Sequence, residues 1–263
     1  IVLWYDKNRL YTITKEEFKT ISINDVTIED LGKMRQNDLQ NYIFFLDSTL
    51  ENISKTRNRK LASMKRLYEY LEVNNFINVN PTKWMKSATI EKRQPKYLNL
   101  NESKQLLANT INSDSRYKIR NYAIICIFLN CSLRLSELVG IDLTDFKIDS
   151  SEQTLIVTGK GNKQRMLYLN EAVCEAIKAY LEVRPKLDKS NKDYNALFLS
   201  SQLKRISKRS VQNIIKTNLI ELIDDIGKES AKYHTHTLRH SCATLLYRAG
   251  VKDNEPIIQL NVG

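Results

Sequence analysis

The three histidines of the chain all lie in one stretch, His234 to His240, which reads HTHTLRH. Arg239 follows His236 by three positions, so both side chains would lie on one side of the first turn of a helix. A guanidinium can bind two anionic oxygens at once, and an imidazole can move a proton near neutral pH. The pair therefore predicts chemistry on a phosphate group.

Two other interpretations of the histidine stretch remain open. Its His-x-His-x3-His spacing could hold a metal ion, although the stretch itself contains no cysteine or carboxylate to complete a ligand shell. The histidines could also be incidental to the start of a helix, because Leu238, Cys242 and Leu245 follow at helical spacing until Gly250.

A second arginine follows the most apolar segment of the chain. Residues 116–130 are apolar most of the way round a helix and should lie at the centre of a domain. The segment CSLRLSEL comes next, with Arg134 and, three residues later, Glu137. A charge so close to a core helix usually has a carboxylate partner or an anionic ligand. The sequence alone favours neither over the other.

Two lysines lie in a predicted β-hairpin. Residues 154–157 and 165–169 have the pattern of two strands, and TGKGNKQ between them allows a tight or bulged turn. The turn would project Lys160 and Lys163, but it does not contain the GxxxxGK[ST] pattern of a nucleotide-binding loop. A solvated hairpin tip would use the same residues, and taken alone that interpretation is favoured.

The elements that must position these residues are mostly helices. At 263 residues the chain is long enough for about two domains. We expect a helical domain over residues 1–90, a basic linker over 91–98 and a second domain over 99–263. The predicted helices cover one or two segments between residues 26 and 46, then residues 54–74, 99–110, 116–130, 170–183, 210–226 and 234–250.

The chain is strongly basic. Lys and Arg number 41 against 30 Asp and Glu, which gives a formal charge of +11. This excess favours nucleic acid as partner over a membrane surface, because no basic amphipathic terminal helix is evident. Clustered cations contact phosphates without reading bases, although a merely solvated face is the alternative. The residues expected to contact nucleic acid are Lys55, Arg57, Arg59, Lys60, Lys65, Lys92, Arg93, Lys163, Lys204, Arg205, Lys208 and Arg209.

Cysteine usage and hydropathy favour a cytoplasmic protein with no membrane partner. The four cysteines lie in apolar helical patterns without paired spacing, which is typical of buried thiols in a reducing compartment. The longest apolar run, residues 123–129, is far below the roughly 20 residues of a membrane span. No signal peptide is visible, and the chain opens with Ile1, so we expect a fragment or a processed product.

Three motifs together resemble those of the tyrosine recombinases, the integrase and Xer-like DNA strand-exchange enzymes. They are LRLSEL, then GKGNKQRMLYL, then HTLRHSCATLLYRAG, and they span about residues 97–250. The resemblance implies a mainly α fold with a small β-hairpin or sheet. It also implies an N-terminal helical core-binding domain and a C-terminal α+β catalytic domain, which clamp duplex DNA, with four protomers on two duplexes.

The resemblance implies a role for each motif residue. Arg134 and Arg239 match the arginines that grip the scissile phosphate, where they would neutralise charge on its non-bridging oxygens. Lys160 matches the hairpin lysine that protonates the departing 5′-oxygen. His236 matches the histidine that exchanges a proton with the attacking or leaving group.

Two further positions match the family in a supporting role. Glu137 and His240 correspond to residues that hold the arginines and the helix start. The resemblance implies no metal, because the guanidinium pair supplies the charge that a divalent ion supplies elsewhere. It implies no nucleotide cofactor, because a protein–DNA link conserves the energy of the phosphodiester bond.

The chain departs from the family pattern after Val251. The family continues with LGH, or Trp for that His, and then a Tyr nucleophile that forms a 3′-phosphotyrosine, whereas KDNEPIIQLNVG contains none of these residues. Tyr247 lies inside the motif helix and does not match the nucleophile. We expect truncation or omitted residues rather than natural loss, and hence an inactive chain unless a Tyr downstream of Arg239 is restored.

Two other functions remain open at this point. A non-catalytic DNA-binding protein of the same architecture would bind duplex DNA without cutting it. A phosphodiesterase using His236 and Arg239 would turn over single-stranded nucleic acid and release free ends.

Overall fold

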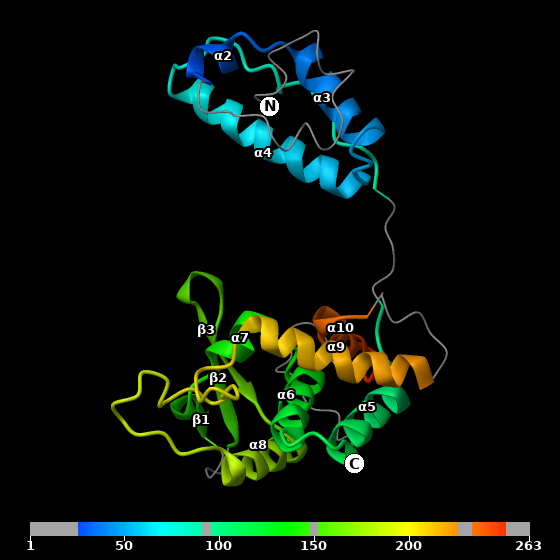
Figure 1. The fold of residues 1–263 in the computed structure, drawn as a ribbon, viewed down its shortest axis with the longest axis vertical. Helices are drawn as coiled ribbons and strands as arrows, with labels where there is room; N and C mark the ends of the chain where they lie inside the picture. Colours follow the sequence, from blue (N-terminus) through cyan, green and yellow to red (C-terminus); the bar gives the residue numbers. More distant parts are fainter. Residues whose placement is uncertain (1–25, 91–95, 148–151, 226–232, 251–263) are drawn as a thin grey trace. The chain divides into compact units, whose positions relative to one another are not determined.

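The computed structural model describes residues 26–90, 96–147, 152–225 and 233–250 (Figure 1). The chain divides into two compact units, residues 1–93 and 94–263. Helices dominate both units, and a small sheet belongs to the second. The predicted mainly α fold with a small β-sheet is therefore confirmed.

The described part of the first unit consists of α2 (Ile28–Gly32), α3 (Gln36–Ser48) and α4 (Ser54–Val73). The bounds of α4 agree with the predicted helix over residues 54–74. Apolar residues on α3 and α4 form one core, which includes Leu39, Leu46 and Leu61. The buried Tyr68 of α4 donates its hydroxyl to the Leu31 carbonyl at 3.1 Å, so α4 also holds α2.

The second unit contains six helices and three strands within the described residues. They are α5 (Leu100–Asn112), α6 (Lys118–Cys131), α7 (Leu135–Gly140), β1 (Phe146–Lys147), β2 (Thr154–Thr158), β3 (Gln164–Tyr168), α8 (Glu171–Val183), α9 (Lys208–Asp225) and α10 (Thr235–Arg248). The predicted capping box opens α5, where Asn99 accepts from the Glu102 N–H and Glu102 accepts from the Asn99 N–H.

Helix α6 forms the centre of the second unit. Eleven of its residues are buried, and it packs against α5, α8, α9 and α10, which surround it (Figure 1). The predicted central helix over residues 116–130 is thus confirmed. Because α6 ends at Cys131, the residues that follow it emerge directly from the core.

The sheet has the order β1-β2-β3 and is antiparallel throughout. Strands β2 and β3 correspond to the two predicted strands, and Val157 pairs with Arg165 in their register. The sequence did not predict β1 or α7. At two and six residues, these elements are too short to show a periodic pattern.

Two buried arginines fix the chain between α8 and α9. Arg184 donates four hydrogen bonds of 2.7–3.1 Å to the main-chain carbonyls of residues 185, 194, 196 and 197. Arg120, near the start of α6, donates to the Leu199 carbonyl at 2.8 Å. Burial lowers the pKa of both guanidinium groups. The guanidinium N–H groups thus satisfy main-chain carbonyls of a segment that forms no regular helix or strand.

The described residues contain no helix that is both long and apolar enough to cross a membrane.

Candidate phosphate site

The histidine stretch forms the start of α10. His234 is the N-cap residue, and its N–H donates to the Thr237 hydroxyl at 3.0 Å. Thr235 and Thr237 are buried, whereas His236 is exposed and Arg239 is partly buried. This difference in burial follows from the helix, because one face of α10 packs on the core while His236 lies on the outer face.

His236 lies among positive groups. Its ring stands edge-on to that of His234, with centroids 5.7 Å apart. Partial burial lowers the pKa of His236, and the nearby charges of His234, His240 and Arg239 lower it further. The imidazole is therefore held toward its neutral form, which can accept a proton.

Ser132 joins the end of α6 to α10. It adopts the left-handed conformation, with φ of 49°, as the C-cap residue of α6. Its carbonyl accepts a short hydrogen bond from Nη1 of Arg239, and its hydroxyl donates to the Arg239 carbonyl at 3.5 Å. The side chain of Arg239 is thus bound to Ser132, which lies two residues before Arg134 in the chain. Burial and the charge of Arg134 lower the pKa of Arg239, as expected for neighbouring guanidinium groups.

Glu137 is a buried carboxylate beneath Arg134. Its Oε2 accepts the main-chain N–H of Arg134 at 2.7 Å, and its Oε1 accepts Nη1 of Arg134 at 2.9 Å. The Arg134 side chain is nevertheless 56% exposed, against 1% for Glu137. The structure therefore contains the ion pair that the sequence allowed, and it leaves Arg134 accessible to a ligand.

Arg165 was missed by the sequence analysis and is the second partner of Glu137. Its two terminal nitrogens donate to the two carboxylate oxygens, each at 2.9 Å. Burial would raise the pKa of Glu137, but the hydrogen bonds from Arg165 and Arg134 and the charge of Arg165 bring it to about 2. A period-two pattern puts Arg165 on the same face of β3 as the buried Leu167, and a charge there needs a partner. That signal could have identified Arg165.

The turn between β2 and β3 begins beside this carboxylate. The turn is a short 3-10 segment, Lys160–Asn162, in which Gly161 and Asn162 have φ of 73° and 60°. A Cβ added at Gly159 would lie 3.4 Å from Oε1 of Glu137. The backbone of Lys160 therefore follows directly from a residue that lies close to Glu137. The Lys160 side chain lies outside what the structure describes.

The predicted supporting role of His240 stays a prediction. His240 is exposed, and no hydrogen bond joins it to Arg134 or Arg239 within the described residues. The start of α10 is held by the Thr237 hydroxyl, and its middle by Ser241, which accepts the Leu98 N–H at 2.7 Å and donates to the Thr237 carbonyl.

The predicted DNA-contact residues have different surroundings. Arg57 pairs with Asp47 and donates to Ser54, and Arg205 pairs with Asp142 and donates to the Val139 and Ile141 carbonyls. These two guanidinium groups therefore hold the protein's own elements together. The exposed members of the set are Lys55, Arg59, Lys163, Lys204, Lys208 and Arg209, while Lys60 and Lys65 are partly buried. Lys92 and Arg93 lie outside the described residues.

A hollow of about 380 Å³ on the first unit contains part of this basic set. Arg59, Lys60 and Ser63 of α4 line it beside Tyr42 of α3. Burial and the charge of Arg59 lower the pKa of Lys60. The hollow therefore combines cations with an aromatic wall, as a phosphate-tracking surface would.

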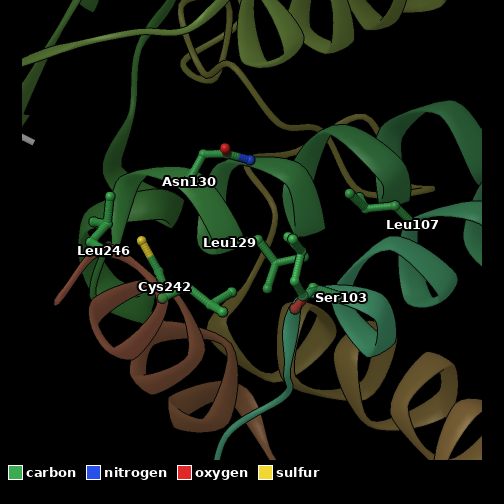
Figure 2. Close-up of a pocket in the computed structure, with 8 residues that line it drawn as sticks. Ser103, Leu107, Leu129, Asn130, Cys242 and Leu246 are labelled. Carbon is green, nitrogen blue, oxygen red and sulfur yellow. The ribbon is translucent and has the colours of Figure 1, made fainter. Parts of the chain in front are cut away.

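A second, smaller cavity lies within the second unit. It measures about 10 Å³ and is enclosed by α5, α6 and α10 (Figure 2). Figure 2 shows Leu107, Leu129 and Leu246 around it, with the Ser103 hydroxyl as a buried group without a hydrogen-bond partner among the described residues. Its size and apolar lining make it a packing gap rather than a ligand site. No group of three or more His, Cys, Asp or Glu in the described residues is placed to hold a metal ion.

Comparison with known proteins identifies the fold that carries this site. Residues 96–259 match the sequence pattern of the phage integrase family. The chain belongs to that family. The match covers every motif residue of the site, from Arg134 to Arg239.

Relatives within the family are named tyrosine recombinases. The chain is 47% identical, over 90% of its length, to "Tyrosine recombinase XerC" of Caldanaerobacter subterraneus subsp. tengcongensis. It is 38% identical, over 73% of its length, to the protein of the same name from Alcanivorax borkumensis. The resemblance to Xer-like tyrosine recombinases is therefore confirmed. The chain spans 64% and 60% of the length of these two relatives.

Solved structures have the same fold. The Tn1549 transposon integrase in complex with transposon right end DNA matches with a TM-score of 0.69 at 17% identity, over 95% of this chain and 87% of that one. The XerH site-specific recombinase bound to palindromic difH substrate matches with a TM-score of 0.66 at 22% identity, over 83% of this chain and 63% of that one.

Proposed function

We propose that this protein is a site-specific DNA recombinase that cleaves and rejoins duplex DNA through a 3′-phosphotyrosine. One observation carries the proposal: Arg239 donates to the carbonyl of Ser132, two residues before Arg134, although the two arginines are 105 positions apart, and the charge of Arg134 lowers the pKa of Arg239. The names of the XerC relatives support the same activity.

The arginine pair would bind the phosphate that is cut. Within the described residues, Arg134 and Arg165 share the carboxylate of Glu137, and Arg239 lies close enough for their charges to lower its pKa, so positive charge remains in excess. A phosphodiester carries one negative charge, and its five-coordinate transition state carries two. Preorganised positive charge therefore stabilises the transition state more than the bound substrate.

The proton transfers would use His236 and Lys160. A tyrosine oxygen attacks the phosphorus, and neutral His236 accepts the proton that the tyrosine loses. The bond from phosphorus to the 5′-oxygen breaks, and Lys160 donates a proton to that oxygen. Attack by a 5′-hydroxyl then restores the phosphodiester and frees the tyrosine. Tyr247, exposed on α10, is not proposed as the nucleophile.

The two units would divide the work on DNA. We assign residues 1–90 to a core-binding domain, because the exposed cations of α4 form a surface suited to phosphate contacts. Residues 99–263 form the catalytic domain, joined to the first by the basic linker over 91–98. Four protomers on two duplexes would form the active assembly. The cytoplasm is the proposed location, since all four cysteines are free and buried.

Covalent trapping tests this function. The protein is translated from its native reading frame, with any residues that the frame encodes after Gly263, and incubated with nicked duplexes selected by binding from a random pool. We expect a protein–DNA adduct that resists denaturation. Arg239→Ala should remove it. Tight duplex binding without an adduct would instead support the non-catalytic DNA-binding protein.

A further inference from the structure

Glu137 is a junction between three elements rather than the partner of one arginine. Its two oxygens accept four hydrogen bonds of 2.7–2.9 Å, two from Arg134 at the start of α7 and two from Arg165 on β3. The third element is the hairpin turn, because a Cβ at Gly159 would lie 3.4 Å from Oε1 of Glu137 and 3.8 Å from Nη1 of Arg165.

The division of donors between the two arginines is unequal. Arg165 uses both terminal nitrogens of its fork on Glu137, and its side chain is 37% exposed. Arg134 uses only Nη1, and its side chain is 56% exposed. Arg165 thus fixes the carboxylate in two directions, while Arg134 keeps donors that can reach a ligand.

The position of Arg165 on the sheet links it to Lys160. Arg165 pairs with Val157, next to the pair Thr158 and Gln164 that closes the strands before the turn. The N–H of Gly159 donates to the Lys163 carbonyl at 2.8 Å across the base of the turn. A side chain that anchors this part of β3 to Glu137 therefore anchors the base from which Lys160 begins.

We propose that Arg165 is a positioning residue for strand cleavage: through Glu137 it sets the turn that carries Lys160 at a fixed place relative to Arg134. This inference rests on the proposed function. Arg165 would act indirectly, by positioning Lys160, which protonates the leaving oxygen, and Arg134, which binds the phosphate. It would not itself contact the DNA. Loss of its fork should slow cleavage while leaving most duplex affinity, which comes from many other cations.

The test compares Arg165→Gln and Arg165→Lys with Arg116→Gln, which removes an exposed arginine that contacts Tyr117 at the far end of α6. Single-turnover adduct formation is measured on a duplex with the ordinary 5′-oxygen and on one with sulfur in its place. We expect Arg165→Gln to be roughly 10- to 100-fold slower on the ordinary duplex, with duplex affinity within about threefold of the parent. Arg165→Lys should be intermediate, because an ammonium cannot donate as a fork.

The sulfur-containing duplex separates positioning from ordinary structural support. A thiolate leaves without protonation, so the defect of Arg165→Gln should shrink by about threefold or more on that duplex. An equal defect on both duplexes, or a rate equal to that of Arg116→Gln, would overturn the inference. If Arg165→Gln does not fold, the same comparison on Arg165→Lys decides. Absence of an adduct with the parent protein would instead count against the proposed function.

Discussion

The two ends of α6 present arginines in opposite ways. Near its start, Arg120 together with Arg184 is buried, and both donate to main-chain carbonyls of the segment that follows α8. Beyond its end, Arg134 and Arg239 are accessible and keep donors that no other described residue uses. A buried guanidinium that donates mostly to groups of its own chain holds a fold, whereas an accessible one with few internal partners can bind a ligand.

The difference is also one of charge. The buried pair has no carboxylate partner within the described residues, and its charge is met by carbonyl dipoles. At the other end, Arg134 and Arg165 share one carboxylate. The third guanidinium group, of Arg239, is close enough for their charges to lower its pKa. The first arrangement satisfies each cation internally, and the second keeps positive charge for an anion from outside.

The largest expected effect on stability is at Arg184. Arg184→Met keeps the apolar stem and removes the donors of four carbonyl bonds, so we expect the free energy of unfolding to fall by about 3–5 kcal/mol. Urea unfolding measures it, with Arg116→Met as the exposed control. A loss below about 1 kcal/mol would show that the carbonyls find other partners and would break the comparison.

Arg239→Met should have the opposite profile. Adduct formation should fall by about 100- to 1,000-fold, because one preorganised donor to the phosphate is lost. The free energy of unfolding should change by less than about 1 kcal/mol, since the protein uses a single side-chain bond of Arg239. A large loss of stability with unchanged adduct formation would instead show that Arg239, like Arg120 and Arg184, mainly holds the fold.

Acid should weaken the second unit through Glu137. Its pKa is about 2 in the folded protein against an ordinary 4.5, so its stabilisation is complete above pH 4.5 and is lost as pH falls through 2. The shift corresponds to about 3 kcal/mol. Urea unfolding at several pH values should show this loss in the parent and a shallower pH dependence in Glu137→Gln. Equal pH dependence in both would contradict the shared-carboxylate account.

The smallest expected effect is at Ser132. Gly adopts a φ of 49° without strain and keeps the carbonyl that accepts from Arg239. Ser132→Gly should therefore change the free energy of unfolding by less than about 1 kcal/mol and adduct formation by less than about threefold. A larger loss of adduct would mean that the serine hydroxyl, rather than its carbonyl, positions Arg239.

Sequence patterns predicted the long elements and not the links between them. The periodicity of α4, the apolar run of α6 and the capping box of α5 are local properties, so they appear in the sequence. Arg165 meets Glu137 across 28 positions, and Arg239 meets the Ser132 carbonyl across 107. No local pattern specifies such partners. The same limit explains why the partners of Arg57 and Arg205, Asp47 and Asp142, were not predicted; their DNA contacts stay a prediction.

The most direct measurement is a crystal structure of the protein bound to a selected duplex. The account predicts that Arg134 and Arg239 donate to the non-bridging oxygens of one and the same phosphate, at about 2.7–2.9 Å, with His236 beside it. Two arginines on different phosphates, or both turned away from the DNA, would contradict it.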